Sequence, residues 1–475
     1  MTFPQAAGEI IGRLEGAGYE AWVVGGAVRD AYLAGAAKRA EGTGGAFRRI
    51  KSLLHKEEGE PVWGEGVDLH DIDFATDARP EEIEAVFSDC KTVDVGKSFG
   101  TIKVVWRDIP YEITTYRSEE GYRDGRHPDR VTYSDKIEED LLRRDFTMNA
   151  MACHPERGLL DPFDGRGDLK KGLLRAVGNP KDRIEEDGLR MLRAVRFAAR
   201  LGLVLEPHLQ EAIQSHKEDL TRLSMERCLE EMTRMLTDKS AGRAIQAMES
   251  LGLLPVLIPE IDSALARQRY DFLPPEEDYR WACLLSSLSP QQGESRSRRA
   301  KKILRRFKSS NDLQDRVAIL LREDIELPKD QSQAQTFVGE LGDMAMPYLL
   351  FRKSGPDAFL ARKKSEIGRR RGQGTKLEKY RDEIIQSMDL VRTVQRNRLP
   401  TRVSDLAIGG RDLMDMGYNQ GKQIGVTLDR LLALVIEGKV ENTREALMAW
   451  AEESRASSKE EDPLRRESRK SKEKE

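Results

Sequence analysis

The pattern of apolar residues changes near residue 150, and this change constrains the fold more than any other feature of the chain. Before it, short β-branched and aromatic runs such as AWVV (21–24), TIKVVW (101–106) and YEITTY (111–116) predict strands separated by turn-forming residues. After it, apolar residues recur with helical spacing, as in DGLRMLRAVRFAARLG (187–202). We therefore expect an α+β protein with a mixed sheet in its N-terminal part and helices in the remainder.

The same change predicts the domain organisation. The 475 residues are enough for several packed cores, and we expect a sheet-containing head at 1–150, a helical neck at 151–255, and a helical body and tail at 256–452. Two segments do not fit regular structure. Residues 36–66 are Gly-rich and charged and are interpreted as a flexible insertion with at most a short helix, and residues 453–475 are almost wholly polar and are interpreted as a disordered tail.

Composition excludes several classes of protein. The sequence has no 18-residue apolar run and no signal-peptide pattern at its start, so we expect no membrane partner and a cytoplasmic location. Its four cysteines lie far apart without a CxxC pair, which argues against zinc and against a disulfide framework. The net charge of −3 conceals a segment at 362–381 with nine Lys or Arg. That segment is interpreted either as a solvated surface or as a contact for a polyanion.

Two carboxylates, Asp71 and Asp73, flank one isoleucine in DLHDIDFATD (68–77). On a strand they would lie on one face with Cα atoms roughly 6.5 to 7 Å apart. Their mutual repulsion is costly unless a cation lies between them, and Mg²⁺ is the hard cation that binds carboxylates together with substrate phosphates. The sequence therefore indicates a Mg²⁺ site for nucleotide chemistry, and the alternative is an acidic turn at a solvent edge.

A glycine pair precedes the first helix after AWVV. Gly25 and Gly26 would place backbone N–H groups at the helix start, where they attract phosphate, and Arg29 could add a charged contact. The alternative is a turn that needs glycine only for its geometry.

Two further motifs combine acids with arginines. RRDFTMNA (143–150) offers Arg144 for phosphate, Asp145 for a ribose hydroxyl, and Asn149. The helix that contains 187–202 repeats charges at steps of three and would align one acid with three guanidiniums on a single stripe: Asp187, Arg190, Arg193 and Arg196. Ordinary salt-bridged, solvated helices are the alternative for both motifs.

Taken together and in this order, GGAVRD (25–30), DID (71–73), RRDFTMNA (143–150) and EDGLR (186–190) resemble the class II tRNA nucleotidyltransferases and bacterial poly(A) polymerases. These families belong to the polymerase-β-like nucleotidyltransferase superfamily. The resemblance covers residues 5–255 strongly and resumes at 405–450, whereas 256–400 match weakly. The insertion at 36–66 departs from the family pattern, in which the first helix leads almost directly to the DxD strand.

The resemblance implies a catalytic head, a neck that reads the base, and a body and tail that bind tRNA. Asp71 and Asp73 would hold Mg²⁺, with Glu112 as a third carboxylate. The incoming nucleotide would be bound by Gly26, Arg29, Arg144, Asp145 and Asn149 at its phosphates and ribose, by Asp187 and Arg190 at its base, and by Arg193 and Arg196 as the remaining cationic lining.

The expected reaction is template-independent addition of CMP and AMP from CTP and ATP to the tRNA 3′ end. The segment 117–131 resembles the flexible loop that CC-adding members shorten, which disfavours a CC-only enzyme. An A-adding enzyme, a poly(A) polymerase and an inactive RNA-binding protein remain as alternatives. The basic run at 362–381, with Arg369, Arg370 and Arg371, is the expected contact for tRNA.

Overall fold

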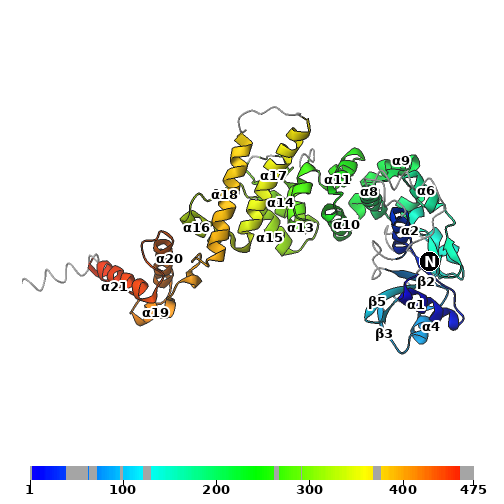
Figure 1. Cartoon of the computed structure of the whole chain (residues 1–475), viewed down its shortest axis with the longest axis horizontal. Helices are drawn as coiled ribbons and strands as arrows, with labels where there is room; N and C mark the ends of the chain where they lie inside the picture. The colour runs from blue at the N-terminus through cyan, green and yellow to red at the C-terminus, as the bar shows by residue number, and fades with distance from the viewer. Residues whose placement is uncertain are drawn as a thin grey trace, which may run out of the picture. The chain divides into compact units, whose positions relative to one another are not determined.

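The computed structural model describes residues 3–38, 63, 72–96, 100–120, 130–261, 267–289, 291, 293–366 and 376–460. These residues form two compact units (Figure 1). The first extends to residue 267 and includes 275–289 and 303–310, and the second holds the rest. Among the described helices, none is long and apolar enough to cross a membrane.

The head contains a sheet of seven described strands in the order β3-β4-β5-β2-β1-β8-β9. Only β2 and β5 run parallel, and the other neighbours are antiparallel, so the sheet is mixed, as the sequence predicted. The sheet continues past residue 150, the expected boundary of the head, because β8 and β9 belong to it. The strands are β1 (Ala21–Val24), β2 (Asp73–Thr76), β3 (Lys91–Gly96), β4 (Thr101–Trp106), β5 (Ile109–Thr115), β8 (Ala152–His154) and β9 (Gly158–Leu160).

The core of the head lies against the central strands. All four residues of β1 are buried, which fits a short, wholly apolar strand between two neighbours. Trp22 and Val24 pack with Tyr116 and with Ile137 and Leu141. The head also contains a separate hairpin, and its elements are α1 (Gln5–Gly16), α2 (Gly26–Lys38), α4 (Pro80–Val86) and α5 (Ile137–Leu142), with the hairpin strands β6 (Arg117–Glu120) and β7 (Arg130–Tyr133).

The neck is helical and follows the head directly in the first unit. Helix α8 buries Met191, Leu192 and Val195 and packs against α10 and α11. Two short strands, β10 (Leu173–Leu174) and β11 (Val204–Leu205), pair in parallel beside these helices. The helices are α6 (Gly165–Lys171), α7 (Pro180–Glu186), α8 (Leu189–Leu201), α9 (Pro207–His216), α10 (Met225–Thr237), α11 (Ala241–Ser250), α12 (Leu254–Leu257) and α13 (Glu277–Leu285).

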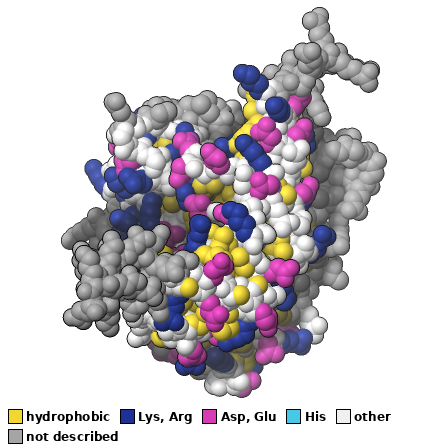
Figure 2. All heavy atoms as spheres, turned by 90° about the vertical axis from the view of Figure 1, so that its left-hand side faces the viewer, with side chains coloured by type: hydrophobic (Ala, Val, Ile, Leu, Met, Phe, Trp, Pro, Cys, Tyr) yellow, Lys and Arg dark blue, Asp and Glu magenta, His cyan; other side chains and the backbone are white. Residues whose placement is uncertain are grey.

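The second unit is helical, and its C-terminal helices share a tail core in which Leu413, Leu431 and Leu447 are fully buried. Figure 2 shows that Lys and Arg side chains alternate with Asp and Glu over the described surface of one face. The helices are α15 (Asn311–Leu320), α16 (Gln331–Leu341), α17 (Ala345–Glu366), α18 (Lys376–Arg396), α19 (Gly410–Asp415), α20 (Lys422–Ile436) and α21 (Arg444–Glu460), and α14 (Arg296–Arg306) is shared between the units.

One expectation for the C-terminal segment is corrected. Residues 453–475 were expected to be disordered, but α21 continues to Glu460. Leu447 and Ala451 anchor the helix in the tail core, and extending an established helix costs little for a sequence rich in Glu, Ala, Arg and Lys. Residues 461–475 and most of 36–66 lie outside the described residues.

The cysteines form no disulfide with one another in this structure: Cys90 is half-buried, and Cys153, Cys228 and Cys283 are buried. Burial raises the pKa of Cys228 to about 11, so this thiol is protonated at neutral pH.

Candidate active site

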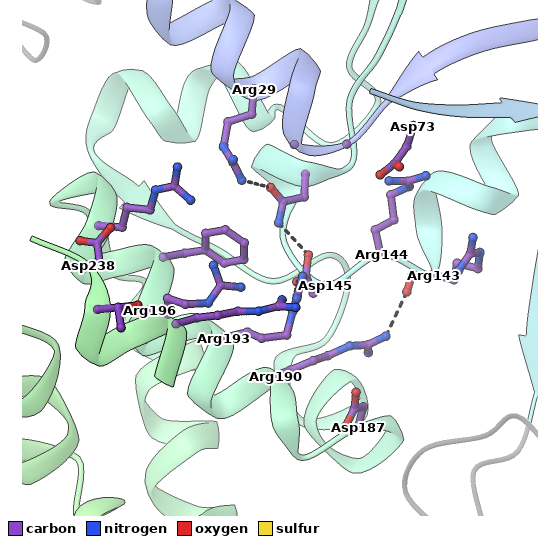
Figure 3. A pocket seen from close by; sticks show the side chains of 17 residues that line it. Arg29, Asp73, Arg143, Arg144, Asp145, Asp187, Arg190, Arg193, Arg196 and Asp238 are labelled. Atoms are coloured by element: carbon purple, nitrogen blue, oxygen red, sulfur yellow. Dashed lines mark hydrogen bonds and ion pairs between the residues drawn. The ribbon is translucent and has the colours of Figure 1, made fainter. Parts of the chain in front are cut away.

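A cavity of about 660 Å³ lies in the first unit where the head meets α8 and α10 (Figure 3). Eight arginines and four aspartates line it, so its charge is strongly positive and suits a polyphosphate. The lining residues are Gly25, Gly26, Arg29, Asp73, Arg143, Arg144, Asp145, Asn149, Asp187, Arg190, Arg193, Arg196, Phe197, Arg200, Arg234, Thr237 and Asp238.

The glycine turn between β1 and α2 forms one wall. Gly25 has φ of +77°, a backbone conformation that favours glycine, and a Cβ there would also displace the guanidinium of Arg144, whose Nη1 would lie 2.8 Å away. The turn delivers α2, whose N-terminus begins at Gly26, to the cavity. N–H groups at a helix start together with Arg29 make this wall suitable for phosphate.

Asp73 begins β2 and is exposed to the cavity. Its register partner on the parallel strand β5 is Glu112, and Lys103 is the partner of Glu112 on β4. Lys103 Nζ lies 3.1 Å from Glu112 Oε1. Directly paired residues share one face of a sheet, so Asp73 and Glu112 lie side by side.

The other carboxylate of the DxD motif, Asp71, lies outside the described residues. Within the described part of the chain, no group of three His, Cys, Asp or Glu is arranged to hold a metal ion. Asp73 and Glu112 supply the oxygen ligands that Mg²⁺ prefers, and the residues present therefore fit a hard divalent ion.

A buried aspartate that the sequence analysis did not single out anchors the RRDFTMNA motif. Asp140 on α5 is fully buried and pairs with Arg143 at 2.7 Å and with Arg144 at 3.1 Å. Burial opposes its ionisation, but the charges of Arg143 and Arg144 outweigh burial and hold the pKa of Asp140 below its usual range. The pair fixes both arginines at the edge of the cavity.

A chain of polar contacts runs from α2 to α8. Arg29 donates to Asn149 Oδ1 at 2.7 Å, Asn149 donates to Asp145 Oδ1 at 3.0 Å, and Arg193 donates to Asp145 Oδ2 at 2.6 and 2.8 Å. The backbone N–H of Phe146 also donates to Asp145, so this carboxylate accepts four hydrogen bonds. Burial disfavours its charge, but Arg193 and Asn149 outweigh burial and lower the pKa of Asp145. Asp145 therefore holds Asn149 and Arg193 in place at the cavity wall.

The structure corrects the expected position of Asp187. The sequence analysis placed it on one helix with the three arginines, but it ends α7 in an extended conformation and precedes α8. Its Oδ1 accepts from the N–H of Leu189, since an aspartate competes for the free donors at a helix start. Its Oδ2 accepts from Arg227 of α10 at 2.7 Å. Asp187 still lines the cavity, but loop geometry rather than a helical turn sets its direction.

Arg190 lies on the first turn of α8 and keeps part of its donor capacity. It contacts the carbonyl of Arg183 at 2.9 Å, the carboxylate of Glu186, and the carbonyl of Arg143 at 3.1 Å. A guanidinium has five N–H donors, so two remain after these contacts among the described residues. Figure 3 shows Arg190 and Asp187 at the same end of the cavity.

Arg196 sits deeper on α8 and is held by a buried acid of α10. Its Nε lies 2.7 Å from Glu231 Oε2, and Glu231 also lies 3.7 Å from Arg193. Burial lowers the pKa of Arg196, the pair with Glu231 opposes this, and the nearby charges of Arg193 and Arg234 add to the lowering. Like charges are thus concentrated at this wall, which an anionic ligand would relieve.

The cavity brings together most of the residues that the sequence analysis named. Glu112 lies beside it on the next strand, and Asp71, Arg369, Arg370 and Arg371 lie outside the described residues. The sequence analysis missed Arg200, Arg234, Thr237 and Asp238 in the lining, and Asp140, Arg227 and Glu231 behind it. A signal for Glu231 existed, because an acid on the apolar face of a helix needs a buried partner.

A mixed sheet that presents Asp73 to a cationic cavity, with a glycine turn at its side, defines a nucleotidyltransferase. Comparisons with known proteins agree with this class. Residues 21–175 match the family model described as the poly A polymerase head domain, 202–265 the probable RNA and SrmB-binding site of polymerase A, and 274–451 the putative tRNA nucleotidyltransferase domain 2.

The chain belongs to the family of CCA-adding enzymes. It is 34% identical over 449 residues to the CCA-adding enzyme of Bacillus velezensis, which covers 93% of this chain and 96% of the relative. It is 33% identical over 441 residues to that of Bacillus subtilis, covering 91% and 94%. The crystal structure of the Bacillus stearothermophilus CCA-adding enzyme in complex with CTP superposes with a TM-score of 0.69 at 29% identity, covering 97% of this chain and all of that one.

Proposed function

We propose that this protein adds CMP and AMP from CTP and ATP to the 3′ end of tRNA, completing and repairing the CCA end without a nucleic-acid template. The observation that carries the proposal is the single cavity in which GGAVRD, Asp73, RRDFTMNA and EDGLR meet. Because its substrate is tRNA, we expect the enzyme to work in the cytoplasm.

The phosphates of the nucleotide bind at the glycine turn. The backbone N–H of Gly25 already donates to the carbonyl of Met151 at 3.1 Å, so the amide of Gly26 and the guanidinium of Arg29 provide donors on one side, and Arg144 is fixed on the other by Asp140. The 3′-hydroxyl of the tRNA attacks the α-phosphate at the Asp73 end of the cavity, and pyrophosphate leaves along the arginine-lined wall. These fixed cations stabilise the charge of the transition state without reorganising.

The carboxylates at this end are suited to Mg²⁺. Asp73 and Glu112 would hold it, together with Asp71. When bound, the ion would withdraw charge from the phosphate and lower the pKa of the attacking hydroxyl. Lys103 neutralises part of the charge of Glu112 when no ion is present.

Asp187 and Arg190 are suited to read the base. Cytosine and adenine both offer an exocyclic amine next to a ring-nitrogen acceptor, whereas uracil and guanine offer a carbonyl and an N–H in the equivalent places. An ionised Asp187 accepts and Arg190 donates, so the pair complements C and A. Arg227 holds Asp187 at 2.7 Å and limits its freedom to turn away.

Ribose contact by Asp145 requires a further step. Its four hydrogen bonds already come from within the protein, so a ribose hydroxyl would have to replace one of them. We propose that Arg144 approaches the ribose and phosphate directly and that Asp145 acts mainly by holding Arg193 and Asn149.

Two tRNA substrates test this function, one ending at its discriminator base and the other ending after CC. Each is incubated with the protein, Mg²⁺, CTP and ATP, with one of the two nucleotides labelled. We expect two C residues and then one A on the first tRNA, and one A on the second. Incorporation only on tRNA ending in CC would identify an A-adding enzyme, and long A tails a poly(A) polymerase. No incorporation on either tRNA would refute the proposal and would favour the alternative of an inactive RNA-binding protein.

A further inference from the structure

Phe197 on α8 contacts three guanidiniums at once. The Cζ atoms of Arg196, Arg29 and Arg193 lie 4.3, 5.1 and 5.4 Å from the centroid of its ring. Phe197 itself lines the cavity, although only 6% of it is exposed. One aromatic ring therefore supports arginines from two helices, α2 of the head and α8 of the neck.

The Phe197 ring can support several guanidiniums without occupying their N–H groups, which a polar partner cannot do. Three guanidiniums within 5.4 Å of one point repel one another, so each needs support in this place. Each is already paired with acid: Arg29 with Asp30, Arg193 with Asp145 and at 3.7 Å with Glu231, and Arg196 with Glu231. A further carboxylate or carbonyl would occupy N–H groups, whereas a ring face attracts a guanidinium and leaves the N–H groups at its edge available to a ligand.

The ring is itself held in place. Phe146 packs edge-on against it with centroids 5.9 Å apart and an interplanar angle of 79°. Phe146 is 1% exposed and directly follows Asp145, which binds Arg193. The orientation of the Phe197 ring is therefore tied to the same segment that fixes Arg193 and Asn149.

We propose that Phe197 is a positioning residue for the triphosphate of the incoming nucleotide, setting the spacing of Arg29, Arg193 and Arg196 across the junction between head and neck. The inference rests on the proposed function and adds to it a residue whose side chain has no hydrogen-bonding atom. The ligand chemistry is a chain of phosphate oxyanions, whichever base the nucleotide carries. The ring touches none of the reacting atoms and acts through the arginines.

The test measures triphosphate binding separately from transfer. Inorganic triphosphate with Mg²⁺ is titrated calorimetrically into the parent and into Phe197→Leu, and steady-state kinetics are measured with CTP, ATP and tRNA. We expect Phe197→Leu to weaken triphosphate binding about tenfold and to raise the KM of CTP and ATP similarly. The KM for tRNA should stay within about twofold, and kcat should change less than KM because the lost support acts on binding.

Three further variants make the result specific. Phe197→Tyr keeps the ring face and should recover most of the triphosphate affinity. Phe197→Met fills the volume without a π face and should behave like Leu, so it provides the test if the Leu variant does not fold. Phe87→Leu is the matched control. Phe87 is also a buried ring that contacts an arginine, with Arg13 Cζ 5.2 Å from its centroid, and it also packs edge-on against another ring, Trp106, but it does not line the cavity.

Unchanged triphosphate binding in folded Leu or Met variants would overturn the proposal. So would equal losses in Phe197→Tyr and Phe197→Leu, or an equal loss in Phe87→Leu. Failure of the proposed function is distinguishable, because in that case the parent itself would transfer no CMP or AMP, whatever its affinity for triphosphate.

Discussion

The carboxylates around the cavity differ in what they contact. Asp140 and Asp145 are buried and paired with arginines, so their charges act inside the protein. Asp73 is exposed at the start of β2 and faces the cavity. Loss of Asp140 should therefore affect the fold first, whereas loss of Asp73 should affect the reaction first.

Asp73→Ala should reduce transfer by about 10³-fold or more while leaving tRNA binding close to that of the parent. A metal-held phosphate contributes several kcal/mol to the transition state, and each factor of ten corresponds to about 1.4 kcal/mol. Incorporation of labelled CMP and a filter-binding assay with tRNA measure the two properties. Asp135→Ala, at an exposed aspartate away from the cavity, is the control. Near-parental turnover of Asp73→Ala would refute the metal-site assignment.

Asp187→Asn should relax the choice of base. An amide can donate as well as accept, so the penalty against the carbonyl of uracil falls, and one good base contact is worth about 1 to 3 kcal/mol. We expect the ratio of kcat/KM for CTP over UTP to fall about tenfold or more. Asp182→Asn, on the first turn of α7, is the control. An unchanged preference for C and A would place base selection elsewhere.

Single site residues were predictable from the sequence where they belong to a local motif. Gly26, Arg29, Asn149 and Arg190 all reach one cavity. The partners of Arg227 and Glu231 were not predictable, because they lie 40 and 35 positions away along the chain, although the place of Glu231 on an apolar helix face indicated that it has a buried partner. Asp187 was placed on the wrong element: its spacing fits a helix, but it lies in extended conformation between α7 and α8 and accepts from the N–H of Leu189 at the start of α8.

At the scale of elements, strongly periodic segments were predictable and very short strands were not. The runs that became β1, β4, β5 and α8 carry four or more residues of one pattern. β8 and β9 have three residues each, too few for a period of two to be recognised. β8 pairs with the edge of β1, and β9 pairs with β8. Tertiary pairing, not local preference, therefore completed the sheet.

The element α5 should make stability depend on pH through Asp140. Its pKa is below the usual value in the folded protein, so near pH 3 to 4 the unfolded chain binds more protons at this group. The contribution is fully present above the unfolded pKa and is lost as pH falls toward the folded pKa. We expect the free energy of unfolding of the parent to fall more steeply between pH 5 and 3 than that of Asp140→Asn.

Urea titrations at several pH values measure this difference. The variant should also be less stable at pH 7, because removing one partner of a buried pair leaves Arg143 and Arg144 uncompensated. A parent and a variant with equal slopes against pH would contradict the role assigned to the Asp140 pair.

At the scale of the whole molecule, the chain separates nucleotide chemistry from the regions expected to bind tRNA. The cavity lies entirely in the first unit, and the basic segment 362–381 belongs to the second. Several cations of the second unit are paired with acids, such as Arg392 with Asp389 and Lys439 with Glu437. The cluster Arg369, Arg370 and Arg371 lies outside the described residues, so its role stays a prediction from sequence.

Reversing the charge of Arg369, Arg370 and Arg371 to Glu should weaken tRNA binding and flatten the dependence of log Kd on log salt. Fewer counterions are released from RNA when fewer phosphates are neutralised. The affinity for CTP should not change, because the cavity is built from other residues. Reversal of Arg392 and Lys439 is the control, since both already have acidic partners. A salt slope equal to that of the parent would make the segment an ordinary solvated surface.

The measurement that tests the account most directly is the sequence of the 3′ ends made when all four nucleotides compete. The protein, Mg²⁺ and tRNA ending at its discriminator base are incubated with CTP, ATP, UTP and GTP at equal concentration, and the products are sequenced, with Asp73→Ala as the inactive control. If the cavity selects bases and transfers nucleotides, the products end in C-C-A and growth stops there. Ends containing U or G, unlimited addition of A, or no extension by the parent would contradict this account.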